Sequence, residues 1–469
     1  MIMDLFGKSL IELQELIKTK KVSSKEVFDY FAKRSKKYNP KLNAFHTLLD
    51  KPVTESSATG GSLYGIPFSM KDTYNTKGVQ TTASSRVIDD YIPPYNATVY
   101  ERLVKAGAVL LGKSNCDAWG HGSSTENSDF GVTKNPWNND YVAGGSSGGS
   151  AAALSAYLSP FEIGEDTGGS IRLPAAFCGV VGLKVTYGLV SRYGCIAYAS
   201  SLDTVGPMTT SVHDMAAILE IIAGNDPYDA TSTFTKSFSY LNTLDRKVSG
   251  LKIGVPKEYF GEGIDPEVER KTKEALGIFE KLGATVKEIS LPHTKYAIAA
   301  YYLLVTSETS SNLARYDGIR FGNDRNFFAA EAKRRLMLGG YTLSAGYYDQ
   351  YYKKAQKVRT IFREDFDDAF KDVDLIIAPV SPTPAFKIGE KINNPLQMYL
   401  SDIHTVPVNL TGIPSLSVPI GLSKEGLPIG MQIMGNHFQE DKILNVGYQF
   451  EQETNFFDVI KKGREKYKD

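Results

Sequence analysis

A serine that follows two glycines is the residue best suited to nucleophilic chemistry in this sequence. Residues 166–172 read Asp-Thr-Gly-Gly-Ser-Ile-Arg, which places Ser170 in a turn that glycine makes permissive. Backbone amides in such a turn can point at one position and stabilise an oxyanion there. We therefore expect Ser170 as the nucleophile and the amides of Thr167, Gly168 and Gly169, with that of Ser170 itself, as oxyanion donors. The segment lacks the second glycine of the G-x-S-x-G elbow of α/β-hydrolases.

A second turn rich in glycine and serine lies upstream. Residues 144–150 read Gly-Gly-Ser-Ser-Gly-Gly-Ser, and the alanine-rich stretch from Ala151 predicts a helix after them. The turn can expose a hydroxyl and aim backbone N–H groups at an oxyanion or a phosphate. In the structural alternative, the loop only caps the helix. Residues 144–194 hold 11 glycines and six charged residues, which indicates either close approach to a ligand or a tightly packed core.

A serine nucleophile needs a base, and two residue types are available for it. The chain has six histidines, none of them in the glycine-rich segment, and only His121 lies in a comparable loop. Lys71 follows a strand-like run, residues 66–70, whose end can deliver its side chain to a site. Because burial disfavours the charged form of an amine, burial is expected to lower the pKa of Lys71 and make it a base. The alternative is an exposed lysine at a strand end.

One motif match is misleading. Residues 107–114 fit the phosphate-loop pattern G-x-x-x-x-G-K-[ST] letter for letter. The four residues inside the pattern, Ala-Val-Leu-Leu, have the character of a buried strand, whereas a phosphate loop must be an open turn. No clear helix follows at Asn115. We therefore reject ATP binding here and expect a strand that includes residues 108–111.

Together these segments resemble the amidase signature family. The resemblance is carried by residues 144–153, 166–172, 174–179 and 182–184, and it extends over essentially the whole chain. It implies a Ser–cis-Ser–Lys triad, in which Ser170 is the nucleophile, Ser146 the bridging serine and Lys71 the base. It also implies a cis peptide bond between Gly145 and Ser146.

Three positions depart from the family's usual pattern. Glu165 stands where a small hydroxyl residue is usual, Leu173 where glutamine is usual, and Val185 where the pattern has Lys-Pro. None of these is a triad position. Glu165 and Leu173 flank Ser170, so we expect the rim of the pocket to differ there.

Further motifs narrow the resemblance to one branch of the family. They are residues 122–128, 133–138, 311–318, 343–349 and 407–414, which stand-alone amidases do not share as a set. This branch supplies ammonia from glutamine to tRNA-dependent amidotransferases. The resemblance therefore implies glutamine hydrolysis in support of the conversion of Glu-tRNA(Gln) to Gln-tRNA(Gln), with Asp-tRNA(Asn) left open as a second acceptor.

Two other classes of function remain open at this point. One is a stand-alone amidase that acts on a small amide. The other is a non-catalytic structural subunit, and the intact set of Lys71, Ser146 and Ser170 argues against it.

Glutamine carries an α-carboxylate and an α-ammonium, and each needs a partner of opposite charge. The resemblance implies Arg335 for the carboxylate, Asp402 for the ammonium and Tyr301 as a further polar contact. Arg334 is the neighbouring alternative to Arg335, because residues 322–335 form a segment shorter than is usual in the family. Ion pairing away from any substrate is the other interpretation for Arg335 and Asp402.

The resemblance also implies partner subunits. A B subunit is expected to hold ATP, magnesium and the charged tRNA, a small C subunit to complete the complex, and ammonia to pass through an internal channel. No cofactor or metal is expected in this chain. The composition agrees with a tRNA that is held by the B subunit. In this chain 53 Lys+Arg balance 53 Asp+Glu and leave no global basic field for a nucleic acid.

The composition predicts a large protein of the cytoplasm. Its 469 residues are 42% hydrophobic and 23% charged. No apolar run reaches the ~18 residues that a membrane span needs, and the first residues show no signal peptide. The three cysteines, Cys116, Cys178 and Cys195, are too few for a disulfide framework and fit a reducing compartment as small core residues.

Helices and strands alternate along the chain, which favours an α/β protein with the amidase-signature fold, a large mixed β-sheet sandwiched between helices. Helices are expected in the first 45 residues, with Ser23 or Ser24 as a cap, and over 98–106 and 266–282. Strands are expected over 65–71, 108–111, 251–255, 284–289, 374–379 and 427–434, the last before a C-terminal helix. We expect one domain over residues 1–469, with a helical and βαβ insertion at about 225–370 that shapes the substrate side.

Overall fold

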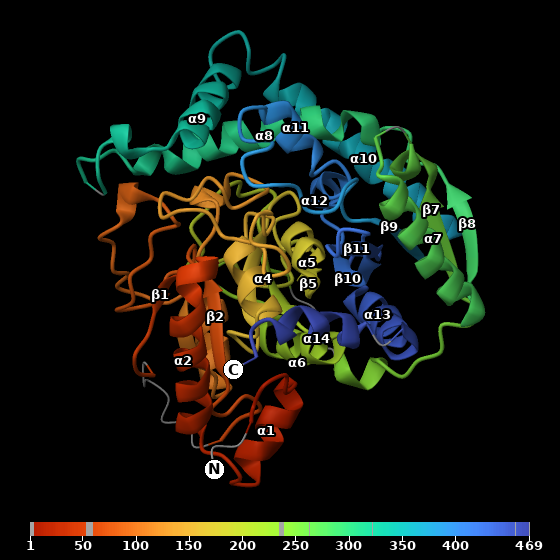
Figure 1. Ribbon diagram of the computed structural model, residues 1–469. Coiled ribbons are helices and arrows are strands. Elements are labelled where there is room, and N and C mark those ends of the chain that lie inside the picture. Colours follow the sequence, from red (N-terminus) through yellow and green to blue (C-terminus); the bar gives the residue numbers. More distant parts are fainter. Residues whose placement is uncertain are drawn as a thin grey trace.

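The computed structural model describes residues 4–52, 60–233, 239–261, 263–320, 322–454 and 456–468. Within them, eleven strands form one sheet (Figure 1). In spatial order the strands are β1 (Phe45–Leu48), β3 (Val109–Ser114), β2 (Pro67–Lys71), β4 (Glu162–Asp166), β6 (Thr204–Thr209), β5 (Val181–Lys184), β10 (Ser415–Leu422), β11 (Pro428–Met434), β9 (Leu375–Pro379), β7 (Lys252–Pro256) and β8 (Thr285–Ile289).

The sheet mixes parallel and antiparallel neighbours, as predicted. β2 runs parallel to β3 and β4, and β7 runs parallel to β8 and β9. The successive pairs from β4 to β9, and the pair of β1 with β3, are antiparallel. Because Met70 pairs with Ile163, the neighbouring strands β2 and β4 bring Lys71 close to the end of β4.

Helices cover both faces of the sheet, which confirms the predicted sandwich. The α-helices are α1 (Leu10–Lys18), α2 (Ser24–Leu42), α3 (Thr98–Lys105), α4 (Gly148–Ser155), α5 (Arg172–Cys178), α6 (Val212–Ile222), α7 (Pro266–Lys281), α8 (Ala297–Asn312), α9 (Ala330–Thr342), α10 (Tyr352–Asp372), α11 (Pro395–Leu400), α12 (Val406–Thr411), α13 (Glu440–Thr454) and α14 (Phe457–Glu465). On one face α6 packs on β5 and β6, and α13 on β10 and β11. On the other face α4 packs on β4 and β6, and α5 on β5, β10 and β11. In the described part of the chain, no helix combines the length and the apolar character needed to cross a membrane.

Glycines line the face of the sheet that meets α4 and α5. In β5, Leu183 joins the apolar cluster that also contains side chains of α6, whereas its neighbour Gly182 faces α5. A Cβ on Gly182 would lie 2.8 Å from the Cβ of Ala175, and a Cβ on Gly164 would lie 2.9 Å from Cγ1 of Ile171. Distances this short leave no room for a side chain. The glycine density of this region therefore serves close packing of helices on the sheet, in addition to any role at a site.

The phosphate-loop match forms a strand, as its apolar centre predicts. Its last six residues are β3, which lies between β1 and β2. The Lys113 side chain is buried and donates to the Tyr74 carbonyl at 2.5 Å. It also donates to the hydroxyls of Thr76 and Thr81 at 3.0 and 2.8 Å. Because these internal acceptors hold its ammonium, Lys113 is not placed to bind a phosphate.

Most predicted helices and strands lie where expected. Ser23 caps α2 through a capping box with Glu26, and α3, α7 and the six predicted strands start or end within a few residues of their predicted bounds. The helix predicted from Ala151 begins earlier, at Gly148. Its first turn includes the second glycine pair, and position 148 requires glycine because a Cβ there would lie 2.2 Å from the Thr125 hydroxyl.

The segment predicted as an insertion, residues 225–370, contributes strands as well as helices. β7, α7 and β8 form a βαβ unit at one edge of the common sheet. α8, α9 and α10 lie together along one side of the molecule, at the top of Figure 1. Residues 234–238, 262 and 321 of this segment are outside the described residues. That it is an insertion that shapes the substrate side stays a prediction.

Candidate active site

Lys71 and Ser146 are in direct contact in the interior of the protein. Lys71 ends β2, and its Nζ donates to Ser146 Oγ at 2.7 Å. Each residue is 1% exposed, so the pair is shielded from solvent. Ser146 lies in the turn before α4, and the peptide bond between Gly145 and Ser146 is cis, as predicted. The two residues expected to pass a proton are therefore in direct contact.

Ser170 lies in the turn between β4 and α5. The Ser147 amide donates to the Ser170 carbonyl at 3.1 Å, which joins this turn to the one that carries Ser146. Ser170 is 7% exposed, more than either partner, and within the described residues no group forms a hydrogen bond with its hydroxyl. This hydroxyl is the most accessible of the three predicted triad groups, as a nucleophile requires.

The predicted oxyanion donors differ in availability. The Gly169 amide donates to Asp166 Oδ1 at 2.9 Å. Burial alone would raise the pKa of Asp166, but the Arg172 guanidinium beside it holds that pKa at about 2, so the carboxylate is a permanent acceptor. Among the described residues, no acceptor faces the amides of Thr167 and Gly168. In this arrangement Thr167 and Gly168 can donate to an oxyanion, whereas Gly169 is engaged internally.

The electrostatic surroundings of Lys71 differ from the prediction. Burial, the largest single influence, acts to lower the pKa of Lys71, but the Glu165 carboxylate together with the thiols of Cys116 and Cys195 acts in the opposite direction, and the pKa is raised above its ordinary value. Glu165 Oε2 lies 3.3 Å from Lys71 Nζ, and both side chains are 1% exposed. Burial acts in the expected direction, but the expected lowered pKa is wrong, because that expectation left out an opposite charge on the neighbouring strand.

His121, the alternative base, is engaged elsewhere. Its Nε2 lies 2.8 Å from the Thr309 hydroxyl, and its ring packs edge-on against Tyr198. Burial, together with the positive charges of Arg335 and Lys71, lowers the pKa of His121 well below its ordinary value. The histidine is therefore neutral, and the contact with Ser146 belongs to Lys71.

We predict that Lys71→Ala abolishes turnover, whereas His121→Ala leaves most of it. Lys71 is in contact with the bridging serine, and His121 bonds to a threonine of α8. Steady-state release of ammonia by both variants, with their melting temperatures as a check of folding, tests the ranking. The opposite ranking would favour a serine–histidine mechanism.

Arg335 is the buried member of the arginine pair, and Arg334 is the exposed one. On α9 the Arg335 side chain is 3% exposed and donates to Glu331 at 2.7 Å, while the Arg334 side chain is 42% exposed and pairs with the same carboxylate. Arg335 also donates to the Tyr198 hydroxyl. Glu331 escaped the sequence analysis, although its spacing of four residues from Arg335 on a helix was a usable signal.

Asp402 and Tyr301 lie near Gly168, in the turn that carries Ser170. Asp402 accepts from the Ser123 hydroxyl at 2.6 Å, and Thr405, three residues on, donates to the Gly168 carbonyl at 2.6 Å. Tyr301 covers Gly168 so closely that a Cβ there would lie 2.3 Å from the tyrosine hydroxyl. Burial raises the pKa of Asp402 to about 7, although the charge of Arg335 acts in the opposite direction. The structure thus brings the predicted substrate residues together next to the Ser170 turn.

A cavity of about 340 Å³ opens beside these residues, which is large enough for a small ligand. Its lining includes Gly122, Ser124, Glu331, Arg335 and Tyr399. The cavity therefore joins the loop that carries Ser123 to the helix that carries the buried arginine.

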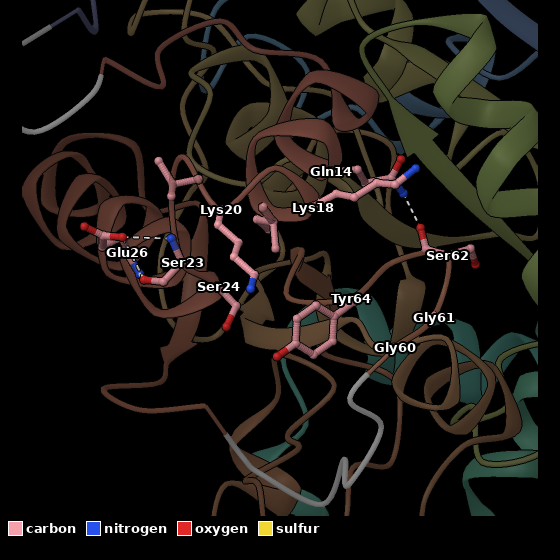
Figure 2. Close-up of a pocket in the computed structure, with 12 residues that line it drawn as sticks. Gln14, Lys18, Lys20, Ser23, Ser24, Glu26, Gly60, Gly61, Ser62 and Tyr64 are labelled. Carbon is pink, nitrogen blue, oxygen red and sulfur yellow. Dashed lines mark hydrogen bonds between the residues drawn. The ribbon is translucent and has the colours of Figure 1, made fainter.

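A larger hollow of about 840 Å³ lies between α1, the start of α2 and the loop at Tyr64 (Figure 2). None of the predicted site residues is among the described residues that line it. Ser23 and Glu26 bond to each other there, and Gln14 donates to the Ser62 carbonyl (Figure 2). We assign no chemistry to this hollow.

We predict that Arg335→Ala raises the glutamine KM about ten- to a hundredfold, the loss expected for a charge-assisted hydrogen bond to a carboxylate. Arg334→Ala is the matched control, since it removes an exposed arginine from the same helix and the same Glu331, and it should change KM little. Initial rates over a range of glutamine concentrations give both values. An unchanged KM in Arg335→Ala, or an equal rise in Arg334→Ala, would contradict the assignment of Arg335 to the carboxylate.

Asp402→Asn should weaken glutamine binding through the ammonium end. Because the pKa of Asp402 is about 7, its carboxylate is present above that pH and is lost as the pH falls. The KM of the unaltered chain should therefore rise below about pH 7, and that rise should be absent in Asp402→Asn. A pH-independent KM in the unaltered chain would contradict the assignment.

Comparisons with known proteins agree with the geometry of the site. The sequence profile of the amidase family, described as Amidase, matches residues 26–444. The chain belongs to the amidase family. This amidase is 50% identical to the A subunit of glutamyl-tRNA(Gln) amidotransferase from Caldanaerobacter subterraneus subsp. tengcongensis, over 97% of this chain and 98% of that one. It is also 50% identical to the same subunit of Geobacillus kaustophilus, over 97% of this chain and 99% of that one.

Two solved structures, one from each branch of the family, differ in their sequence identity to this chain. The amidase superposes on the glutamyl-tRNA(Gln) amidotransferase A subunit from Thermotoga maritima with a TM-score of 0.83 and 42% identity, covering 94% of each chain. It superposes on 6-aminohexanoate cyclic dimer hydrolase with a TM-score of 0.89 but only 27% identity, covering 97% of this chain and 98% of that one. Amide hydrolases share the fold, while the amidotransferase A subunits share the sequence. This amidase groups with the amidotransferase subunits.

Proposed function

We propose that this amidase releases ammonia from glutamine as the A subunit of a tRNA-dependent amidotransferase. Two kinds of support carry the proposal. The contact of Lys71 with Ser146, and the backbone hydrogen bond from Ser147 to Ser170 that joins the two serine turns, support a relay that starts from the accessible hydroxyl of Ser170. Identity of 50% over 97% of the chain to amidotransferase A subunits, against 27% to an amide hydrolase of known structure, favours glutamine over a small free amide.

In the proposed reaction Ser170 Oγ attacks the side-chain amide carbon of glutamine. The Ser170 proton passes to Ser146, and the Ser146 proton passes to neutral Lys71. The amides of Thr167 and Gly168 stabilise the oxyanion of the tetrahedral intermediate. The intermediate then expels ammonia, as the proton on Lys71 returns through Ser146 to the leaving nitrogen, and a glutamyl ester remains on Ser170. Water attacks the ester by the same relay, which releases glutamate and restores the Ser170 hydroxyl.

The substrate ends are assigned in the same proposal. Arg335 binds the α-carboxylate, Asp402 the α-ammonium, and Tyr301 makes a polar contact beside Gly168. The burial of Arg335 and Asp402 and their position next to the Ser170 turn support these roles. Both lie in a protein environment where a charge pair is stronger than in water.

Ammonia released by this chain needs an acceptor, and we assign that acceptor to partner subunits. The proposal places ATP, magnesium and charged tRNA on a B subunit, with a small C subunit in the same complex and no cofactor in this chain. Exposed apolar side chains on α9 support a docking role for that side of the molecule, since Met337 is 76% exposed and Leu338 and Tyr341 are about half exposed.

The test of the proposed function compares glutamine with small neutral amides as sources of ammonia. Glutamine should be preferred, because only glutamine offers charged groups to Arg335 and Asp402. The assay uses the purified chain with and without the partner subunits, and an ammonia-coupled readout. A preference for a simple aliphatic amide, unchanged by the partners, would favour the stand-alone amidase instead.

A further inference from the structure

Glu165 is buried, and its carboxylate forms an ion pair with Lys71, the predicted base. It lies in β4, one residue before Asp166, and is 1% exposed. Its Oε2 is 3.3 Å from Lys71 Nζ. Neither carboxylate oxygen accepts a hydrogen bond from any other described residue. The carboxylate is therefore balanced by Lys71, without the additional donors that usually accompany a buried ion pair.

The backbone around Glu165 is fixed by the turn that carries the bridging serine. The Glu165 amide donates to Ser147 Oγ at 3.4 Å, and Ser147 Oγ donates to the Glu165 carbonyl at 3.2 Å. These bonds hold the carboxylate next to the contact of Lys71 with Ser146. The same strand leads directly into the turn of Ser170, so a movement of this one segment displaces both Glu165 and the nucleophile.

The other titratable groups near the pair do not replace this carboxylate at neutral pH. The thiols of Cys116 and Cys195 also face Lys71, and burial raises both of their pKa values, to about 12 for Cys116. Asp203 faces Glu165, and burial, reinforced by Glu165, raises the pKa of Asp203 to about 7.

Two further titratable groups on the loop after β3 interact with Lys71. Asp117 accepts from the amides of Thr125 and Asn127, and burial raises its pKa to about 7. His121 is neutral, as described above. The phenol of Tyr74, close to Glu165, has a pKa raised well above its ordinary value by burial. Glu165 is thus the one carboxylate among the described residues that forms an ion pair with Lys71.

We propose that Glu165 is a positioning residue that holds Lys71 in its protonated, resting form, so that the base is switched off until this ion pair opens. This inference rests on the proposed function, in which Lys71 acts as the base. An ammonium cannot accept the proton of Ser146, and a carboxylate in contact with it stabilises that inactive form. Removal of the carboxylate leaves burial as the largest influence on Lys71, and burial favours the neutral amine.

The test is the pH dependence of kcat/KM for glutamine in the unaltered chain, Glu165→Gln and Glu165→Ser. Both variants should gain at least about tenfold in kcat/KM at pH 7, and their acid limb should lie at lower pH, because each unit of fall in the pKa of Lys71 raises its neutral fraction tenfold. Glu162→Gln is the control: it replaces a second buried carboxyl group of the same strand, which accepts from Ser114 Oγ and forms no ion pair with Lys71, and it should leave the limb in place.

Temperature separates Lys71 from the nearby aspartates. The pKa of an amine falls markedly on warming, whereas that of a carboxyl group hardly changes, so the acid limb should move with temperature if Lys71 titrates. This measurement needs only the unaltered chain, so it can still exclude Lys71 as the titrating group where a variant does not fold. A temperature-independent limb would overturn the inference.

Two outcomes with folded variants would also overturn it. One is a pH profile and rate equal to those of the unaltered chain. The other is loss of activity at every pH, which would make Glu165 a required proton carrier. Lys71→Ala, made in the unaltered and Glu165→Gln backgrounds, distinguishes the two proposals: activity without Lys71 would refute the proposed function itself, whereas inactivity of both leaves only the role of Glu165 in question.

Discussion

Ser170→Ala should leave a folded chain that has lost at least about a thousandfold of its glutamine hydrolysis, the scale seen when a catalytic nucleophile is removed. The change deletes one hydroxyl that bonds to no described residue, so the melting temperature should stay the same. The rate of ammonia release in the presence of saturating glutamine measures the loss. A glutamine-like electrophile should label the unaltered chain at Ser170 and fail to label the variant.

Ser150→Ala is the matched control for that experiment. Ser150 is a fully buried serine in the first turns of α4, close in sequence to Ser146, and it has no place in the proposed relay. Its removal should leave the rate largely intact. Normal turnover by Ser170→Ala, or equal losses in the two variants, would end the assignment of Ser170 as nucleophile.

The second large effect should come from the partners. A chain that makes ammonia for another subunit wastes glutamine if it works alone, so the isolated chain should be slow. Addition of charged tRNA together with the B subunit should raise its glutaminase rate by about tenfold or more. Such coupling requires that docking stabilises the active arrangement over the resting one, with a typical free energy of about 1–3 kcal/mol.

The comparison of rates with no partner, with the B and C subunits, and with the subunits plus charged tRNA measures this effect. Uncharged tRNA is the control for binding without an acceptor group. If the isolated chain has a full rate, and neither addition changes it, the chain is a stand-alone amidase instead.

The candidates for the triad could be named from the sequence, because the resemblance to the amidase signature family rests on short, contiguous motifs. Ser146 and Ser170 sit in glycine-rich turns, and Lys71 ends an apolar run that became β2. The apolar centre of residues 107–114 was likewise enough to reject a phosphate loop. Local patterns of this kind can be interpreted from the sequence because neighbouring residues largely determine the local backbone conformation.

Properties that depend on contacts between distant segments could not be predicted. The pKa of Lys71 is raised because Glu165 approaches from β4, and only the register of β2 against β4 makes that contact visible. The sequence had marked Glu165 as unusual without showing which side chain it would meet. The engagement of the Gly169 amide by Asp166 depends in the same way on how the turn closes.

The choice between Arg334 and Arg335 shows the same limit on a smaller scale. Adjacent residues of a helix point about 100° apart, so one residue of error in register exchanges a buried side chain for an exposed one. Because residues 322–335 form a segment shorter than is usual in the family, the sequence left the alignment of these two arginines open. The structure shows which of the two arginines is buried: the packing of α9 places Arg335 against Tyr198 and leaves Arg334 near the surface.

The most direct test of the central claim follows the amide nitrogen of glutamine. The assembled complex is supplied with glutamine labelled with 15N in its side-chain amide, ATP, magnesium and Glu-tRNA(Gln), and the amide nitrogen of the tRNA-bound product is analysed by mass spectrometry. We predict 15N in the product of the unaltered complex, none with Ser170→Ala, and recovery of product in that variant when an ammonium salt is supplied directly. Label transfer that persists in Ser170→Ala, or a variant that ammonium does not rescue, would contradict the role of this chain as the source of ammonia.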